Sequence, residues 1–556
     1  MKKKLFTVML MIFLILSLAT SASATSESTN SLFLPHSDGI GDIEINTIPL
    51  PSHVILREAY YTFSGKIIIA YKTAADLTVP DYTNIATLNH DGTNFQTIFS
   101  GLIPVGPKSG GLRYIPFRDN TRVLIGDYVL ECAQSLDNCS STQLIPIEYP
   151  SIIENNPMTV KTWSEVIVAP DNTHISWTTL RATGSAVLFG SLVRDTDKYV
   201  VNNPQIISTV EAFRNDPNNP GFVIPNTIRG GEVKQFVKGG NAISLVGALG
   251  RSTTDSIVQH LDSGNLTQIT YTPGYDETTI FSPDERLGIV MSTRFSEQTD
   301  PAIFGLLPRP HGALNLGQLN GILYTYSISN VRQFREGSIG PVLIDINRSK
   351  YQPGYKGVPL NTDEDWVFTS PMSWHPDGKH ALWQEMYKGT NTKRLQRVTL
   401  LDYQPHAPVP AQTTTENIPY GISDLTVLDS TNMNLNMDVK IKGNHSGQMS
   451  YKNTLNPDYT TSSKIEYVNY SDDGLSYYNG TETMKLNFLG VTRYEANLQA
   501  TGLRQGEMNI RATFASGGSY LSPTNLLFDI DVDGLPKSYG YATYYGTTLN
   551  IEDLIE

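Results

Sequence analysis

The sequence predicts an all-β protein with a long repetitive part followed by a shorter second β region. Short runs rich in Val, Ile, Thr and Tyr, separated by Gly, Pro, Asn and Asp, dominate the 556 residues. One turn motif recurs through the long part, and strict alternation of apolar and polar residues marks the second region. The chain is long enough for several domains, and its 39% hydrophobic residues exclude a wholly disordered protein.

The first residues carry the pattern of a secretory signal peptide, which we assign to residues 1–24. Lys2–Lys4 are positively charged, residues 5–19 are almost wholly apolar, and Ala22–Ala24 form a small-residue cleavage site. The apolar run is short for a membrane span, and no later stretch approaches the ~20 apolar residues that a span needs. We therefore expect a secreted protein without a membrane span. The formal charge of −13 argues against nucleic acid as a partner.

The chain contains 2 cysteines, Cys132 and Cys139, which are close in sequence. In an oxidising compartment we expect them to close a small disulfide loop, and two free thiols are the alternative.

The recurring motif is a Pro-Asp turn followed by a β-run, here called the Pro-Asp turn. Clear copies occupy residues 169–177, 282–290 and 375–383, and degenerate copies occupy 117–125 and 63–69. Pro fixes φ at the first turn position and Asp satisfies backbone groups of the turn, so each copy predicts a hairpin. Some units add a second hairpin signal, such as Asp91-Gly92 between two strand-like runs.

Two hairpins make a four-stranded unit that resembles the blade of TolB-like (PD40) β-propellers, over residues 46–410. The resemblance implies a propeller, and we count six units, beginning near residues 47, 102, 159, 211, 273 and 350; seven blades remain possible. Residues 25–45 precede it as an N-terminal arm.

Beyond the propeller, a stretch rich in Pro and Thr predicts a linker over residues 411–420. Apolar residues then alternate with polar ones, for example at Met437, Val439 and Ile441. This pattern indicates half-buried antiparallel strands, and residues 421–535 resemble an immunoglobulin or fibronectin-like β-sandwich. Residues 536–556 form a C-terminal tail.

The register of the repeats gives the candidate site, because equivalent offsets after each Pro-Asp turn are expected to bring polar residues to one face of the disk. We expect Arg181, Arg294 and Lys72 to form a cationic clamp for a carboxylate. Glu385 and Asp127 are the candidate catalytic carboxylates. Two further candidates for substrate binding precede an inner strand, namely Trp163 and Glu165. The competing interpretation is that strand ends are simply solvated and that such charges tie blades together.

No cofactor and no metal are expected. The histidines lack a ligand spacing, and His375 and His380 flank a turn, where we expect them to be solvated. The acidic segments 361–365 and 529–534 do not match a full calcium loop, so solvated turns are favoured.

Two functions follow from these observations. The first is a secreted glycoside hydrolase acting on a small-molecule or carbohydrate ligand that bears a uronic acid, such as a saponin glucuronide. The segments 176–181, 291–294 and 382–385 suggest a similarity in layout to exported fungal saponin hydrolases. Uronate lyases built on propellers are a more distant comparison. The second function is a non-catalytic extracellular propeller that binds a ligand or a protein.

Overall fold

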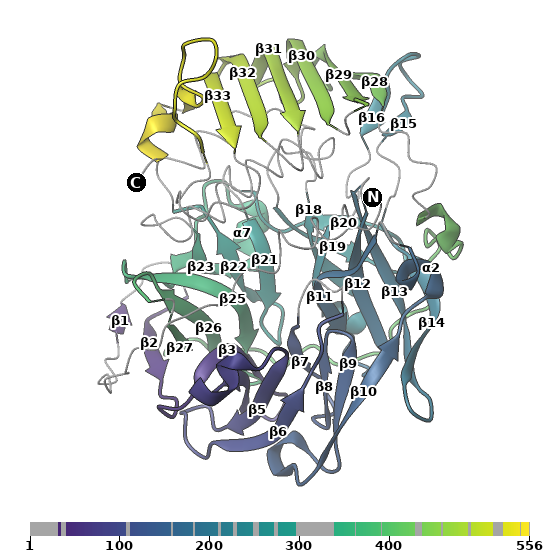
Figure 1. Ribbon diagram of the computed structural model, residues 1–556, viewed down its shortest axis with the longest axis vertical. Helices are drawn as coiled ribbons and strands as arrows, with labels where there is room; N and C mark the ends of the chain where they lie inside the picture. Colours follow the sequence, from purple (N-terminus) through teal and green to yellow (C-terminus); the bar gives the residue numbers. More distant parts are fainter. Residues whose placement is uncertain are drawn as a thin grey trace.

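The computed structural model describes residues 32–34, 40–106, 112–156, 159–181, 184–208, 213–225, 231–247, 255–271, 276–295, 339–361, 363–390, 392–428, 436–457, 460–486, 491–514, 526–544 and 546–554. The protein is nearly all β, and its larger part is a β-propeller of six four-stranded blades, with a separate sheet beyond it (Figure 1). The predicted signal peptide lies outside the described residues.

In blades 1 to 5 the four strands are antiparallel and follow one another in the chain, and a parallel pairing between the last strands of blades 2 and 3 joins these two blades into one eight-stranded sheet. Blade 1 contains β3 (Ile55–Tyr61), β4 (Ile67–Lys72), β5 (Tyr82–Leu88) and β6 (Gln96–Leu102). Blade 2 contains β7 (Tyr114–Pro116), β8 (Arg122–Ile125), β9 (Tyr128–Cys132) and β10 (Thr142–Glu148). Blade 3 contains β11 (Thr159–Val168), β12 (His174–Arg181), β13 (Gly184–Arg194) and β14 (Tyr199–Ile206). Blade 4 contains β17 (Glu232–Val237), β18 (Ala242–Gly247), β19 (Asp255–His260) and β20 (Leu266–Gln268). Blade 5 contains β21 (Asp276–Phe281), β22 (Leu287–Ser292), β23 (Gly340–Asp345) and β24 (Val358–Pro359).

Blade 6 shows how the ring is closed. It contains β25 (Trp366–Trp374), β26 (His380–Tyr387) and β27 (Lys393–Leu400), and its fourth strand is β2 (Ile43–Ile48) from the start of the described chain. β2 pairs antiparallel with β27 along its whole length, and β1 (Leu32–Leu34) pairs with the outer edge of β2. The predicted N-terminal arm therefore contains the beginning of the strand that closes the propeller.

The Pro-Asp turns form hairpins in which the Asp side chain satisfies backbone groups of the turn, as predicted from the sequence. In blade 3, the Asp171 carboxylate accepts hydrogen bonds from the backbone N–H groups of Thr173 and His174, at 2.9 and 3.1 Å. Asn172 occupies the left-handed region with φ of 64°, which Asn tolerates well. In blade 6 the same position is Gly378, with φ of 70°. The turns thus set the register of the first two strands of each blade.

The predicted linker, residues 411–420, is hydrogen-bonded to the turns of the propeller blades. The Gln412 amide donates to the Gly239 carbonyl of blade 4 at 2.9 Å, and the Thr414 amide donates to the Asp171 carboxylate of blade 3 at 2.9 Å. Ile422 then pairs with Ile206 at the edge of β14. Backbone hydrogen bonds to successive turns therefore fix this segment in place.

The C-terminal part is one antiparallel sheet of eight strands in sequence order, rather than the two sheets of the predicted sandwich. Its strands are β28 (Met437–Lys442), β29 (Ser446–Leu455), β30 (Thr461–Ser471), β31 (Ser476–Leu486), β32 (Thr492–Gly502), β33 (Gly506–Phe514), β34 (Tyr539–Tyr544) and β35 (Thr547–Asn550). An alternation of apolar and polar residues indicates that each strand has one buried face, but it does not indicate whether the strands form one sheet or two. The prediction of two sheets therefore differs from the structure. The predicted tail supplies the last two strands.

The hairpin of β15 (Phe213–Asn215) and β16 (Val223–Pro225) attaches this sheet to the propeller, since Phe213 and Val223 pack against its core. The hairpin lies in the connection between blades 3 and 4, and Figure 1 shows it beside β28. Helical segments are short: α2 (Ser151–Glu154), α7 (Ile346–Tyr351), η1 (Ala74–Thr78), η2 (Leu136–Asn138), η3 (Lys238–Gly240), η5 (Leu425–Leu428) and η7 (Ile551–Leu554). Among the described residues, no helix has the length and apolar character needed to cross a membrane.

Candidate functional site

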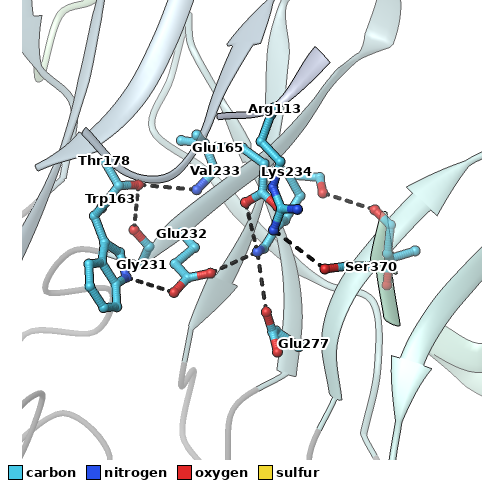
Figure 2. A network of polar contacts seen from close by, with 12 residues as sticks. Arg113, Trp163, Glu165, Thr178, Gly231, Glu232, Val233, Lys234, Glu277 and Ser370 are labelled. Atoms are coloured by element: carbon cyan, nitrogen blue, oxygen red, sulfur yellow. Dashed lines mark hydrogen bonds and ion pairs between the residues drawn. The ribbon is translucent and has the colours of Figure 1, made fainter. Parts of the chain in front are cut away.

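The first strands of the blades line the centre of the propeller and contribute one connected set of polar side chains. We call Glu58, Arg113, Trp163, Glu165, Glu232, Lys234, Glu277 and Ser370 the channel network. Each of the six blades provides at least one member, and Figure 2 shows most of them converging. A set drawn from every blade can meet only at the axis of the ring.

Arg113 connects one half of the channel network. The residue immediately precedes β7 of blade 2, and its Nη1 lies 2.5 Å from Oε1 of Glu58 in blade 1. Its Nη2 donates to the hydroxyl of Ser370 in blade 6 at 3.4 Å, and its Nε lies 3.6 Å from Oε1 of Glu165 in blade 3. One guanidinium therefore contacts three other blades, which suits the planar five-donor geometry of arginine.

Lys234 connects the other half. Its ammonium lies 3.0 Å from Glu165, 2.7 Å from Glu232 and 3.4 Å from Glu277, so it joins blades 3, 4 and 5. Burial lowers the pKa of Lys234, but these three carboxylates outweigh burial and raise that pKa above its usual value. Lys234 is therefore charged, and it holds the carboxylates close to one another.

Trp163 places an aromatic ring at the edge of the channel network. Its indole Nε1 donates to Oε1 of Glu232 at 2.8 Å (Figure 2). The hydroxyl of Thr178 fixes the backbone on both sides of Glu232, because it donates to the Gly231 carbonyl at 2.8 Å and accepts from the Val233 amide at 3.2 Å. The Trp163–Glu232 pair is thus held by both its side chains and its backbone.

β-Bulges direct these side chains to the channel. The register between the first two strands shifts at Glu58, Glu165, Lys234, Glu277 and Ser370 or beside them, in blades 1, 3, 4, 5 and 6. A bulge adds a residue that has no partner on the next strand and turns its side chain away from the regular pleat. The same irregularity, repeated in five blades, therefore builds the channel network.

The members of the network differ in how easily a ligand can reach them. The Lys234 side chain is 2% exposed, whereas Arg113 and Glu232 are 24% and 25% exposed. Trp163 is half-buried.

Burial raises the pKa of Glu58, and the Arg113 guanidinium opposes that shift. The second oxygen of Glu58, Oε2, is buried and has no hydrogen-bond partner among the described residues.

The structure does not bring the predicted catalytic carboxylates together. Glu385 lies on β26, the second strand of blade 6, and is buried. Its Oε1 accepts from the Trp383 indole at 2.9 Å, and its Oε2 lies 2.7 Å from Arg394. Glu385 is thus a fixed partner inside one blade.

Asp127 follows β8 in blade 2, and its carboxylate contacts Lys161 of blade 3 at 3.1 Å. Burial raises the pKa of Asp127, with Lys161 opposing the shift. No contact described for the chain links Asp127 with Glu385.

Two members of the predicted cationic clamp, Arg294 and Lys72, have their partners within two different blades. Arg294 is buried within blade 5, where its Nη2 contacts Asp276 at 2.9 Å. Lys72 ends β4 and donates to the Val79 carbonyl of its own blade at 3.0 Å. Arg181 ends β12, and its side chain is outside the described part. Trp163 and Glu165 are the predicted substrate-binding residues that do lie in the channel network.

A signal for the missed residues exists in the sequence. Glu58, Arg113 and Glu165 each lie six positions before the residue at the Asp position of their turn, and Glu277 and Ser370 lie seven positions before it. Lys234 lies six positions before Gly240, which occupies the corresponding turn in blade 4. Counting backwards along the first strand, instead of forwards along the second, would have found the channel network. The bulges explain why the offset is not constant.

Elsewhere, Cys132 and Cys139 are joined by a disulfide with a Cα–Cα distance of 5.7 Å. In the acidic segment 529–534, Asp529, Asp531 and Asp533 each contact a Lys or Arg side chain. These carboxylates are therefore neutralised by the protein's own cations.

The solved structures that resemble this chain share little sequence with it. No protein-family model matches the chain, and no curated protein matches it. Similar solved structures include a TolB described as putative from Agrobacterium tumefaciens, with 12% identity and a TM-score of 0.32 over 57% of this chain and 88% of that one. They also include an oligogalacturonate lyase from Vibrio parahaemolyticus, with 10% identity and a TM-score of 0.35 over 68% of this chain and 99% of that one.

Proposed function

We propose that the protein is exported and that its propeller binds a carbohydrate at the channel network. The observation that carries this proposal is the convergence of polar side chains from all six blades, charged in five of them, beside a half-buried Trp163. Binding sites commonly combine a concave surface, an aromatic side chain and a few fixed polar groups. Export is supported by the signal-peptide pattern and by the disulfide between Cys132 and Cys139.

The charge of the channel network favours a neutral sugar over a uronate. Glu58, Glu165, Glu232 and Glu277 provide four carboxylates, against the two cations Arg113 and Lys234. A further carboxylate on the ligand would be repelled, whereas sugar hydroxyls can donate to Glu232 and accept from Arg113. The apolar face of a sugar ring can pack on Trp163. This reasoning replaces the uronic acid ligand expected from Arg181 and Arg294.

Binding experiments with oligosaccharides test the proposal directly. Isothermal titration of neutral and uronate-bearing oligosaccharides should show binding of a neutral one, weakened at least tenfold by Trp163→Ala and by Glu232→Gln. Trp366→Ala, which changes another half-buried Trp outside the channel network, and Glu148→Gln, which changes an exposed carboxylate, are the matched controls and should leave affinity unchanged. Absence of any glycan binding, or a strong preference for uronates, would contradict the proposal.

Hydrolysis of the bound carbohydrate is the second candidate function, and Glu58 is the observation in its favour. A general acid needs a raised pKa, and burial raises the pKa of Glu58. Arg113 contacts both Glu58 and Glu165, so a second carboxylate lies nearby. Glu385 and Asp127 are not members of the channel network, and their contacts lie with Arg394 and Lys161.

Assays on neutral aryl glycosides separate the two functions. If the protein is a hydrolase, Glu58→Gln should lower kcat by roughly 100-fold, the size expected for losing a general acid. Glu148→Gln is the control for an exposed carboxylate. A protein that binds glycans with no turnover of any aryl glycoside is a binding propeller only.

A further inference from the structure

A cluster of histidines lies on the Pro-Asp turn of blade 6, which follows the first strand of that blade, β25. The ligand atoms of His375, Asp377 and His380 all lie within 4.8 Å of one another. Nδ1 of His375 is 3.0 Å from Oδ1 of Asp377, and Nδ1 of His380 is 2.7 Å from Oδ2 of the same carboxylate. Two imidazoles therefore flank one carboxylate within a single turn.

Part of this arrangement is ordinary turn structure, as blade 3 shows. There, Oδ2 of Asp171 contacts Nδ1 of His174 at 2.7 Å, which reproduces the pair formed by Asp377 and His380. The residue two positions before Asp171 is Ala169, so blade 3 has no equivalent of His375. Blade 6 is thus distinguished from blade 3 by the added imidazole.

The environment of His375 Nδ1 is unusual for a solvated histidine. The backbone N–H of Asp377 donates to this nitrogen at 3.1 Å, so Nδ1 presents a lone pair. A nitrogen that accepts this hydrogen cannot also donate to Oδ1 of Asp377, although the two atoms are 3.0 Å apart. In blade 5 the equivalent Ser282 has a hydroxyl that donates to the Asp284 carboxylate at 2.6 Å. In blade 6, Nδ1 of His375 and Oδ1 of Asp377 lie close enough to share one cation, which would take the Nδ1 lone pair in place of the Asp377 N–H.

The turn holds its ligand atoms in place. Pro376 fixes one backbone angle, and the His375 amide donates to the His380 carbonyl at 2.8 Å. Asp377 also accepts from the backbone N–H of Lys379 at 2.8 Å. Side chains held by a rigid hairpin lose little conformational freedom on binding an ion.

Besides Tyr61 of β3, a histidine and an arginine face the cluster from other elements. His90, from the turn after β5, lies with its ring 4.9 Å from that of His380 and 5.5 Å from that of His375. Arg397 of β27 donates to the His90 carbonyl at 2.8 Å and is the nearby cation. The imidazoles select a late transition metal over Ca²⁺ or Mg²⁺, which prefer oxygen ligands.

We propose that His375, Asp377 and His380 bind one divalent transition-metal ion of the Zn²⁺ type, at the seam where blade 6 meets blade 1. Two imidazole nitrogens and one carboxylate oxygen are a common donor set for Zn²⁺, with further positions open to water. The ring of Tyr61 in β3 packs edge-on against His375, with centroids 4.9 Å apart. A metal here stabilises the turn that adjoins blade 1, independently of the channel network. This proposal differs from the expectation, drawn from the sequence, that His375 and His380 are simply solvated.

Metal titration of the full protein tests this proposal. The protein, prepared without a polyhistidine tag and treated with a chelator, is titrated with Zn²⁺ by isothermal calorimetry. We expect one saturable equivalent of Zn²⁺ and a rise in Tm on binding, because an ion that binds only the folded state stabilises it. His375→Gln and His380→Gln should each weaken Zn²⁺ binding at least tenfold.

His174→Gln in blade 3 is the matched control, because it removes the same Asp–His contact from a turn that lacks the second histidine. This variant should bind Zn²⁺ as the wild type does. Circular dichroism and Tm in metal-free buffer identify variants that fail to fold, and the comparison uses the folded ones. The proposal is overturned if the wild type shows no saturable binding. It is also overturned if His375→Gln binds Zn²⁺ as tightly as wild type, or if His174→Gln weakens binding equally.

Discussion

Both carboxylate oxygens of Glu385 are engaged inside blade 6, one by Trp383 and the other by Arg394 and Gln396. Arg394 in turn stacks on the Trp366 ring at 4.0 Å. A buried ion pair of this kind costs desolvation when it forms, so its net contribution to stability is small. Removing only one partner lowers the free energy of unfolding strongly, because it leaves the other charge buried and unpaired.

We therefore predict that Glu385→Ala destabilises the protein by about 3–5 kcal/mol, the range for breaking a buried pair. Urea unfolding measures this, with Glu148→Ala as the control, since the exposed Glu148–Lys198 pair should contribute little to stability. Carbohydrate binding by folded Glu385→Gln should equal that of wild type. A lost activity at unchanged stability would instead return Glu385 to the functional site.

At the scale of single residues, the sequence predicted two members of the channel network, Trp163 and Glu165, and took its other candidates from the second strands or the residues just after them. A fixed offset after each turn leads along the second strand, where Glu385 and Arg294 point into the blades and find partners there. The residues that meet in the channel precede the turns, and bulges shift them by one position between blades. Trp163 and Glu165 were found because their position before an inner strand was considered directly.

At the scale of elements, local patterns predicted the hairpins well and the assembly of sheets less well. The Pro-Asp turns specify their own geometry, because each carboxylate satisfies backbone groups only two or three residues away. The closing strand β2 and the sheet order β28 to β35 depend on long-range pairing. No local signal distinguishes one curved sheet from two packed sheets, since both bury alternate residues.

The C-terminal sheet buries a carboxyl group, Glu482 of β31, among the tyrosines of its core. The Tyr467 hydroxyl lies 3.5 Å from its Oε1. Burial raises the pKa of Glu482 to about 8. Below the pKa that Glu482 has in the unfolded chain, this carboxyl is protonated in both the folded and the unfolded state, and no stability is lost through its ionisation. As pH rises from there to about 8, the unfolded state ionises first, so stability falls.

We predict that this loss amounts to roughly 1.4 kcal/mol per pH unit across that window and that Glu482→Gln removes it. Urea unfolding of the C-terminal sheet at pH 5, 6, 7 and 8, followed by tyrosine fluorescence, gives the slope. Glu466→Gln, on the exposed face of β30, is the control and should keep the wild-type slope. An identical pH dependence in Glu482→Gln and wild type would show that Glu482 is ionised in the folded protein.

At the scale of the whole molecule, one short strand determines whether the propeller is a closed ring. β2 completes blade 6, and the chain after β2 continues directly into β3, the first strand of blade 1. The two blades are therefore linked covalently at the seam between them. Ile43 and Ile45 on β2 belong to a core that also contains residues of blades 5 and 6, such as Leu343 and Trp383. The backbone of β2 pairs with β27 from Ile43 to Ile48. Loss of β2 therefore exposes an edge of blade 6 and frees the start of blade 1.

We predict that Ile43→Ala destabilises the propeller by about 2–5 kcal/mol, because Ile43 is fully buried and the change leaves a cavity. Hydrogen exchange should accelerate in both β27 and β3, on the two sides of the seam, while β12 in blade 3 changes much less. Glu44→Ala is the matched control on the same strand, since Glu44 is half-buried and lies on the opposite face. Faster exchange confined to β2 would mean that the strand frays without opening the ring, and that contacts between blades hold the propeller together on their own.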